Sequence, residues 1–184
     1  LIESKQKSAA WFVSHCQTFS KRENLVDELK LFIDVDVYGK CGELECPKSS
    51  NECFNMLDTT YKFYLAFENT LCIDYLTEKL YNAIERFIIP VIYSGADFSR
   101  FLPPKSYIDA NEFDTVEDLA KYLNFLSENP HEYIKYFWWK KYYKIVRSDN
   151  MDLCGLCEKL NQPNFKMKRQ TYTSIKDWFY KDAC

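Results

Sequence analysis

Short apolar runs alternate with amphipathic stretches through most of the chain. The runs at residues 9–13 (AAWFV), 33–38 (IDVDVY) and 63–67 (FYLAF) have the length and composition of buried β-strands. Between the first two runs, apolar residues from Leu25 to Phe32 recur at a helical spacing. A strand, a helix and a strand within about 30 residues have the size of a βαβ unit. The pattern therefore predicts parallel strands joined by helices.

The same alternation continues toward the C-terminus. A helix is predicted at about residues 75–87, and a fourth strand at residues 88–93 (IIPVIY), although Pro90 disfavours a central position in a sheet. Thr115 is expected to cap a further helix, and Pro130 to begin another. Strands that alternate with helices predict an α/β fold with a mostly parallel sheet.

Two local signals refine this prediction. Ser20 and Glu23 match a capping box, with Ser20 as the N-cap and Glu23 at the third helical position. Residues 39–60 are interpreted as a loop that holds three clustered cysteines.

Composition limits the class of protein. Apolar residues make up 47% of the 184 residues and aromatic residues 17%, which excludes a disordered chain and allows a sizeable core. The net charge is only −3 and its residues are interspersed, so nothing favours nucleic acid or an anionic membrane as a partner. No apolar run approaches the roughly 18 residues that a spanning helix needs. The start at Leu1 is expected for a piece of a longer protein.

Eight cysteines suggest an oxidising compartment. They are Cys16, Cys41, Cys46, Cys53, Cys72, Cys154, Cys157 and Cys184. We favour disulfides over zinc or reduced thiols, because the spacing lacks the paired knuckles of a zinc ribbon. The cluster from Cys41 to Cys72 is predicted to contain at least one disulfide, with the connectivity left open. Cys154 and Cys157 form one C-x-x-C without a second pair.

Three positions at predicted strand ends or helix starts are candidates for a ligand site, because ligands of α/β folds bind beyond the carboxyl ends of the strands. Arg22 and Lys79 lie near helix starts, where a cation opposes the helix dipole and a bound phosphate would resolve the conflict. Tyr38 precedes Gly39, where an aromatic ring could stack on a base. The alternative is that both cations are simply solvated. Neither a dinucleotide fingerprint nor a P-loop is present, and no carboxylate pair is spaced for an essential metal.

The residues around these positions resemble a known family. The segments FYLAFEN (63–69), DYLTEKLYNA (74–83) and IIPVIY (88–93) closely resemble the donor-site signature of the α1,3-fucosyltransferases. The similarity extends upstream to WFVSHCQTFSKR (11–22) and downstream to the C-x-x-C, so it covers nearly the whole chain. The cysteine-rich loop is similar to that of invertebrate members.

The resemblance implies a fold and an activity. Members use GDP-fucose, invert the anomeric carbon, and contain two Rossmann-like domains that face a cleft. This chain resembles the carboxyl-terminal one, with a GDP-fucose-binding domain at residues 1–145 and a cysteine-containing tail at 146–184. The implied reaction is transfer of fucose to the 3-hydroxyl of a GlcNAc in a glycan acceptor. No metal is expected to be essential, although stimulation by a divalent metal is left open.

The resemblance also implies roles for individual residues. Glu78 matches a carboxylate near the ribose and fucose, where it could stabilise oxocarbenium character. The implied donor-binding residues are Arg22 and Lys79 at the pyrophosphate, Tyr75 and Asn69 of the signature, Tyr38 near the guanine, and Ser14 in the first strand-to-helix loop. His15 stands where relatives commonly have Asn, which puts the contact of that loop in doubt.

Other parts of the enzyme are expected outside this chain. The general base is implied to be a carboxylate of an amino-terminal acceptor domain, and the C-x-x-C is implied to bridge to that domain. A membrane anchor and a lumenal Golgi location are implied as well. Within the motif, Glu68 directly follows a predicted buried strand, and it could orient the loop rather than catalyse. Two alternatives stay open, namely a silent nucleotide- or glycan-binding relative and a disulfide-stapled interaction module.

Overall fold

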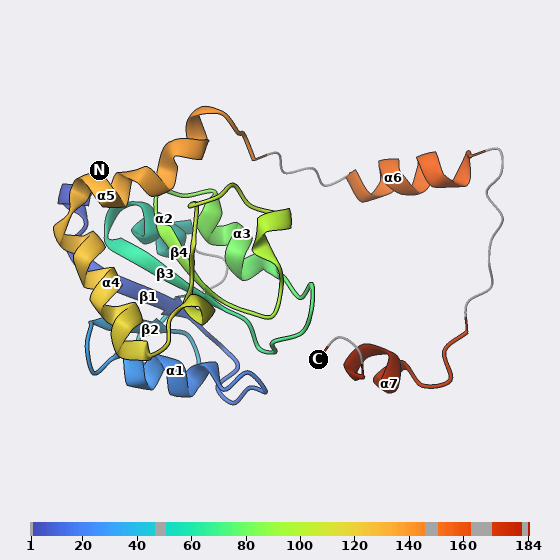
Figure 1. Ribbon diagram of the computed structural model, residues 1–184, viewed down its shortest axis with the longest axis horizontal. Helices are drawn as coiled ribbons and strands as arrows, with labels where there is room; N and C mark the ends of the chain where they lie inside the picture. The colour runs from blue at the N-terminus through green and yellow to red at the C-terminus, as the bar shows by residue number, and fades with distance from the viewer. Residues whose placement is uncertain (1, 47–50, 146–150, 163–170, 182–183) are drawn as a thin grey trace.

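The protein is described by a computed structural model at residues 2–46, 51–145, 151–162, 171–181 and 184. Its centre is one parallel sheet in the order β2-β1-β3-β4-β5 (Figure 1). The strands are β1 (Lys7–Phe12), β2 (Val35–Tyr38), β3 (Tyr61–Phe67), β4 (Ile89–Tyr93) and β5 (Ile108–Asp109). The predicted α/β fold with a parallel sheet is therefore confirmed.

Helices cover both faces of the sheet. They are α1 (Arg22–Leu29), α2 (Asn51–Thr59), α3 (Glu78–Ile84), α4 (Val116–Glu128) and α5 (Pro130–Ile134), with 3₁₀ helices η1 (Ile2–Ser4), η2 (Phe98–Arg100), η3 (Ala110–Glu112) and η4 (Lys135–Lys141). Alternate residues of β3 enter different cores, because successive side chains of a strand point to opposite faces. Phe63, Leu65 and Phe67 pack with α1 and α4, whereas Tyr64 and Ala66 pack with α2 and α3.

The strand predicted around Pro90 is confirmed, although proline has no amide hydrogen to donate. Pro90 pairs with Tyr64 of β3, but β5 pairs only with Val91 and Ile92. At Pro90 the strand therefore has a neighbour on one side only, which is where a sheet tolerates proline.

The capping box predicted at Ser20 is wrong. Helix α1 begins at Arg22 after Lys21, whose φ of 56° lies in the left-handed region. The Ser20 hydroxyl instead donates to the carbonyl oxygen of Glu68 at 2.7 Å, and the Glu23 carboxylate accepts from the Thr18 amide and hydroxyl. A contact between two strand-to-helix loops has replaced the local cap.

Two further elements differ from the prediction. Residues 51–59 form α2 rather than a loop, because Cys53 and Leu57 lie four residues apart and are both buried. Strand β5 was not predicted, since two residues carry no readable periodicity. Thr115 does cap α4, accepting from the Asp118 amide at 3.1 Å.

Three disulfides join described segments of the chain. Cys46–Cys53 lies within the cluster, so the predicted disulfide is present there, while Cys41 pairs with Cys16 and Cys72 with Cys184. Cys154 and Cys157 are free and exposed on α6 (Met151–Leu160). The first residue of the predicted tail, 146, lies outside the described residues, and the proposed boundary stays a prediction. None of the described helices, α7 (Ile175–Tyr180) included, is long and apolar enough to cross a membrane.

Candidate functional site

A pocket of about 470 Å³ lies at the carboxyl ends of β1, β2 and β3. Six predicted site residues line it: Ser14, Arg22, Tyr38, Asn69, Glu78 and Lys79. Parallel strands place their carboxyl ends at one edge of a sheet, so the topology explains why residues so far apart in sequence meet there. Tyr75 is the exception. It lines a neighbouring pocket of about 950 Å³, which shares His15 and Asn69 with the first.

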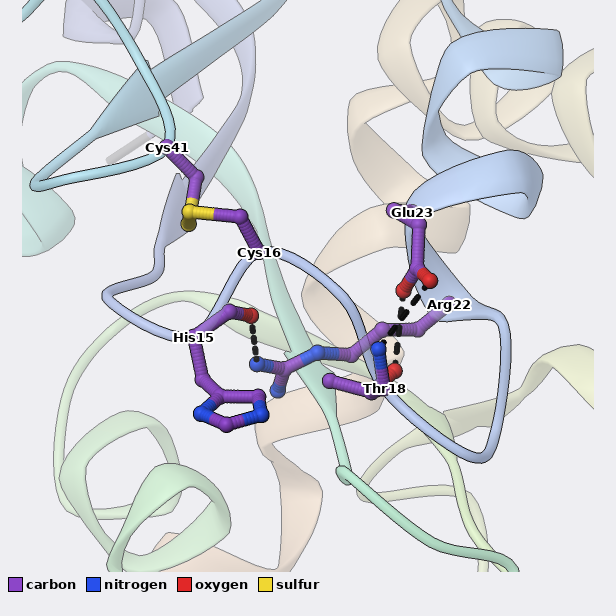
Figure 2. The surroundings of a disulfide bond; sticks show 6 residues. All are labelled: His15, Cys16, Thr18, Arg22, Glu23 and Cys41. Atoms are coloured by element: carbon purple, nitrogen blue, oxygen red, sulfur yellow. Dashed lines mark hydrogen bonds between the residues drawn. A yellow bond between two sulfur atoms is a disulfide. The ribbon is translucent and has the colours of Figure 1, made fainter.

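Arg22 is buried rather than solvated, with 2% of its surface exposed. Its Nη2 donates to the carbonyl of His15 at 3.1 Å (Figure 2). Its Nη1 donates to the carbonyl of Phe67 at 2.5 Å, and the guanidinium lies 5.5 Å from the Trp11 ring. Burial lowers the pKa of Arg22, but a guanidinium stays charged in proteins. Its Nε is buried and has no hydrogen-bond partner within the described structure. The guanidinium is thus fixed in place, and its Nε–H has no acceptor within the described structure.

Lys79, in the first turn of α3, is held by a carboxylate that the sequence reasoning did not pair with it. Its Nζ donates to Glu68 Oε2 at 2.8 Å and to the Thr77 hydroxyl at 2.7 Å. Glu78 Oε1 is 3.8 Å away, and the Glu78 side chain is 74% exposed. The principal partner of Lys79 is therefore Glu68, eleven residues earlier, rather than its sequence neighbour. The only signal in the sequence was an acid directly after a buried strand.

Another part of the pocket wall is aromatic. Phe12 packs edge-on against Tyr38, Phe54 and Tyr64, with ring centroids 5.1 to 5.7 Å apart. The Tyr38 ring is itself buried, and its hydroxyl lies 2.7 Å from that of Tyr61. The pocket therefore combines an aromatic cluster with two cations.

Two backbone features bring the strand ends close together. Gly39 has φ 97°, and an added Cβ would lie 2.5 Å from the Val13 carbonyl oxygen and 3.4 Å from Ser14 Oγ. A side chain at residue 39 would therefore collide with the loop that carries Ser14. Asn69 is anchored through its carbonyl, which accepts from the Ser20 amide at 3.0 Å, while its Oδ1 is buried without a partner.

A disulfide joins the two loops at this edge. Cys16 lies beside His15 in the loop before α1, and Cys41 follows Gly39 after β2, with their Cα atoms 5.3 Å apart (Figure 2). Among the described residues, no group of three or more His, Cys, Asp or Glu could hold a metal ion. The absence of an essential metal stays a prediction.

Comparison with known proteins supplies the family. Residues 2–178 match the family model of glycosyltransferase family 10 (fucosyltransferase), C-terminal part. The chain is 51% identical over 183 residues to alpha-(1,3)-fucosyltransferase C of Drosophila melanogaster, covering 100% of this chain and 43% of that protein. It is 44% identical over 150 residues to alpha-(1,3)-fucosyltransferase fut-1 of Caenorhabditis elegans, covering 81% of this chain and 35% of that protein.

A solved structure agrees on the fold. A crystal structure of an alpha1,3-fucosyltransferase with GDP-fucose superimposes with a TM-score of 0.64 at 22% identity, over 77% of this chain and 41% of that chain. The chain thus spans less than half the length of these relatives. It belongs to glycosyltransferase family 10, the fucosyltransferases, and corresponds to the C-terminal part of its members.

Proposed function

We propose that this chain supplies the donor site of an enzyme that transfers fucose from GDP-fucose to the 3-hydroxyl of a GlcNAc in a glycan, with inversion. Relatives named as α1,3-fucosyltransferases and a structural neighbour crystallised with GDP-fucose support the reaction class and the donor. The observation that carries the proposal is the pocket of about 470 Å³ in which two fixed cations meet an aromatic cluster. The cations suit the diphosphate of a nucleotide, and the aromatic cluster suits its base.

Two unsatisfied atoms strengthen the assignment. Arg22 Nε is a buried donor and Asn69 Oδ1 a buried acceptor, and neither has a partner in the described structure. A buried polar group left unpaired costs about 1–3 kcal/mol. A phosphate oxygen would accept from Arg22, and a sugar hydroxyl would donate to Asn69. GDP-fucose offers both groups.

The proposed chemistry follows from charge separation. The bond between the anomeric carbon and the diphosphate oxygen breaks, and its electron pair leaves with GDP. Lys79 and Arg22 stabilise the negative charge on that leaving group. Glu78, exposed at the pocket mouth, faces the positive charge that develops on the sugar. The acceptor hydroxyl loses its proton to a general base, which we assign to a part of the protein outside these 184 residues.

The other donor contacts are also proposals. Tyr38 would contact the guanine, and Ser14, Asn69 and Tyr75 would contact the remainder of the donor. Since Tyr75 lines the adjoining pocket rather than the first, it would reach the sugar end. Three disulfides fit an oxidising compartment, and we propose the Golgi lumen, with membrane attachment through another part of the protein.

Nucleotide titration tests the proposal. Calorimetry of the chain with GDP, GDP-fucose and UDP should show binding of both guanine nucleotides and much weaker binding of UDP. Binding of none of the three would contradict a donor site and favour an interaction module. Guanine-selective binding without transferase activity in the full-length protein would identify a silent relative.

A further inference from the structure

Glu68 is a buried acid with every oxygen engaged. It follows β3 directly, is 1% exposed, and is not one of the residues that line the pocket. Its Oε1 accepts from the Thr77 amide at 2.9 Å and the Thr77 hydroxyl at 2.7 Å, and its Oε2 from Lys79 Nζ at 2.8 Å. The hydrogen bonds of the Glu68 carboxylate thus go to Thr77 and to the pocket residue Lys79.

The end of β3 anchors both pocket cations. The carbonyl of Phe67 accepts from Arg22, and the carboxylate of the next residue, Glu68, accepts from Lys79. The Glu68 backbone is fixed as well, because its amide donates to the Tyr93 carbonyl at 2.9 Å and its carbonyl accepts from Ser20. A rigid strand end thus determines where the two positive charges lie.

Lys79 keeps one N–H of its ammonium available. An ammonium has three donors, and two of them are directed at Glu68 and Thr77. Lys79 also lines the pocket with 16% of its side chain exposed. The two anchored donors determine the direction of the third.

We propose that Glu68 is a positioning residue for donor binding: its buried carboxylate, together with the Thr77 hydroxyl, holds the Lys79 ammonium so that its remaining N–H meets the diphosphate. This inference rests on the proposed donor site. We assign Glu68 a positioning role rather than a catalytic one, because it does not line the pocket.

Charge and positioning predict opposite changes in GDP affinity when Glu68 is neutralised. A carboxylate beside a phosphate-binding lysine opposes an anionic ligand, so neutralising Glu68 should tighten GDP binding if only charge mattered. Positioning predicts weaker binding, because a freed lysine regains many rotamers. The nearest other carboxylate is the exposed Glu78, which would draw Lys79 toward the pocket mouth. The sign of the change in affinity therefore separates the two accounts.

The test is a double-mutant cycle on GDP affinity, measured by calorimetry with Glu68→Gln, Lys79→Ala and the double variant. Glu68→Gln keeps the shape and should weaken GDP by about tenfold, the order expected from releasing one lysine side chain. In the Lys79→Ala background the same change should alter affinity by less than about twofold, because coupled residues are not additive.

Asp58→Asn is the matched control. Asp58 also accepts from a cation and from a backbone amide, those of Arg86 and Phe87, both at 2.7 Å, but it does not line the pocket. Its substitution should leave GDP affinity unchanged. Thr77→Val supplies a second variant in case Glu68→Gln does not fold. It removes only the hydroxyl that accepts from Lys79 together with Glu68. It should weaken GDP binding severalfold, again only when Lys79 is present.

The outcomes are distinct. Unchanged or tighter GDP binding in both Glu68→Gln and Thr77→Val would overturn the inference, as would equal losses with and without Lys79, which would indicate a general structural role. If the parent chain does not bind GDP, the proposed function itself fails, and the inference fails with it.

Discussion

The two cations of the pocket are held in different ways, and this difference sets what each substitution should do. Lys79 lines the pocket and is anchored by the side chains of Glu68 and Thr77, whereas Arg22 is buried and ties the first strand-to-helix loop to the end of β3. Removing Lys79 should weaken ligand binding and also leave the buried Glu68 carboxylate without its cation. Removing Arg22 should act on binding and on the fold together.

Lys79→Ala should weaken GDP binding by about tenfold to a hundredfold, because a charge-assisted hydrogen bond is worth roughly 1.5–3 kcal/mol. The melting temperature should fall as well, because the buried Glu68 carboxylate loses its cationic partner. Lys121→Ala is the control, since Lys121 forms an exposed pair with Glu117 on α4. Calorimetry measures the affinity, and thermal unfolding measures the melting temperature. If Lys79→Ala bound GDP as tightly as the parent, Lys79 would not belong to the site.

Arg22→Ala should weaken GDP by a similar factor and also lower the free energy of unfolding by about 1–3 kcal/mol, because two backbone carbonyls lose their donor. Thermal unfolding without ligand isolates the second effect. A variant as stable as the parent would show that the buried contacts of Arg22 contribute nothing to the fold.

Tyr38→Ala should reduce GDP affinity and narrow the difference between GDP and UDP, because it opens the aromatic cluster around Phe12. Tyr38→Phe keeps the ring and removes only the hydroxyl, with its contacts to Tyr61 and Met56, so it should keep the preference for guanine. Competition of GDP and UDP for each variant provides the measurement. An unchanged preference in Tyr38→Ala would place the base elsewhere.

Helices and loops meet at this edge through contacts that no local pattern contains. Strands β1, β3 and β4 could be predicted because they are apolar on both faces, as strands buried between helix layers are. The actual role of Ser20 could not be predicted, because its hydroxyl donates to the carbonyl of Glu68, 48 residues away. The pairing of Glu68 with Lys79 was hidden for the same reason: it depends on how α3 returns to the end of β3.

The Cys16–Cys41 disulfide links the loop before α1 to the loop after β2, so it should support the geometry of the pocket. Cys16→Ser with Cys41→Ser should lower stability by about 3 kcal/mol, the value expected from a loop with a sequence separation of 25. GDP affinity should fall severalfold, because the loops gain freedom that binding must remove.

Cys154→Ser with Cys157→Ser is the control for this pair, since both thiols are free. Denaturant unfolding and calorimetry compare the two double variants. Equal stability in both would show that the Cys16–Cys41 bond does not form in solution.

Taken whole, the chain corresponds to less than half of its relatives, and binding and transfer should separate in it. It should bind GDP-fucose yet transfer no fucose to GlcNAc-terminated glycans. Loss of a general base alone costs about 10² to 10⁴ in rate, and loss of acceptor positioning costs more. Incubation with labelled GDP-fucose and a glycan panel measures transfer. Robust transfer would place the base within these 184 residues.

The Cys72–Cys184 disulfide gives the two chain ends unequal surroundings. It fastens the last residue to the loop between β3 and α3, which leads into the cation Lys79. The first described residues precede β1 and so lie at the amino edge of the sheet, away from the pocket. An affinity tag or a surface attachment at the amino end should therefore leave the nucleotide free to enter. The same fusion at residue 184 would be held by the Cys72–Cys184 bond to the loop that connects β3 with α3.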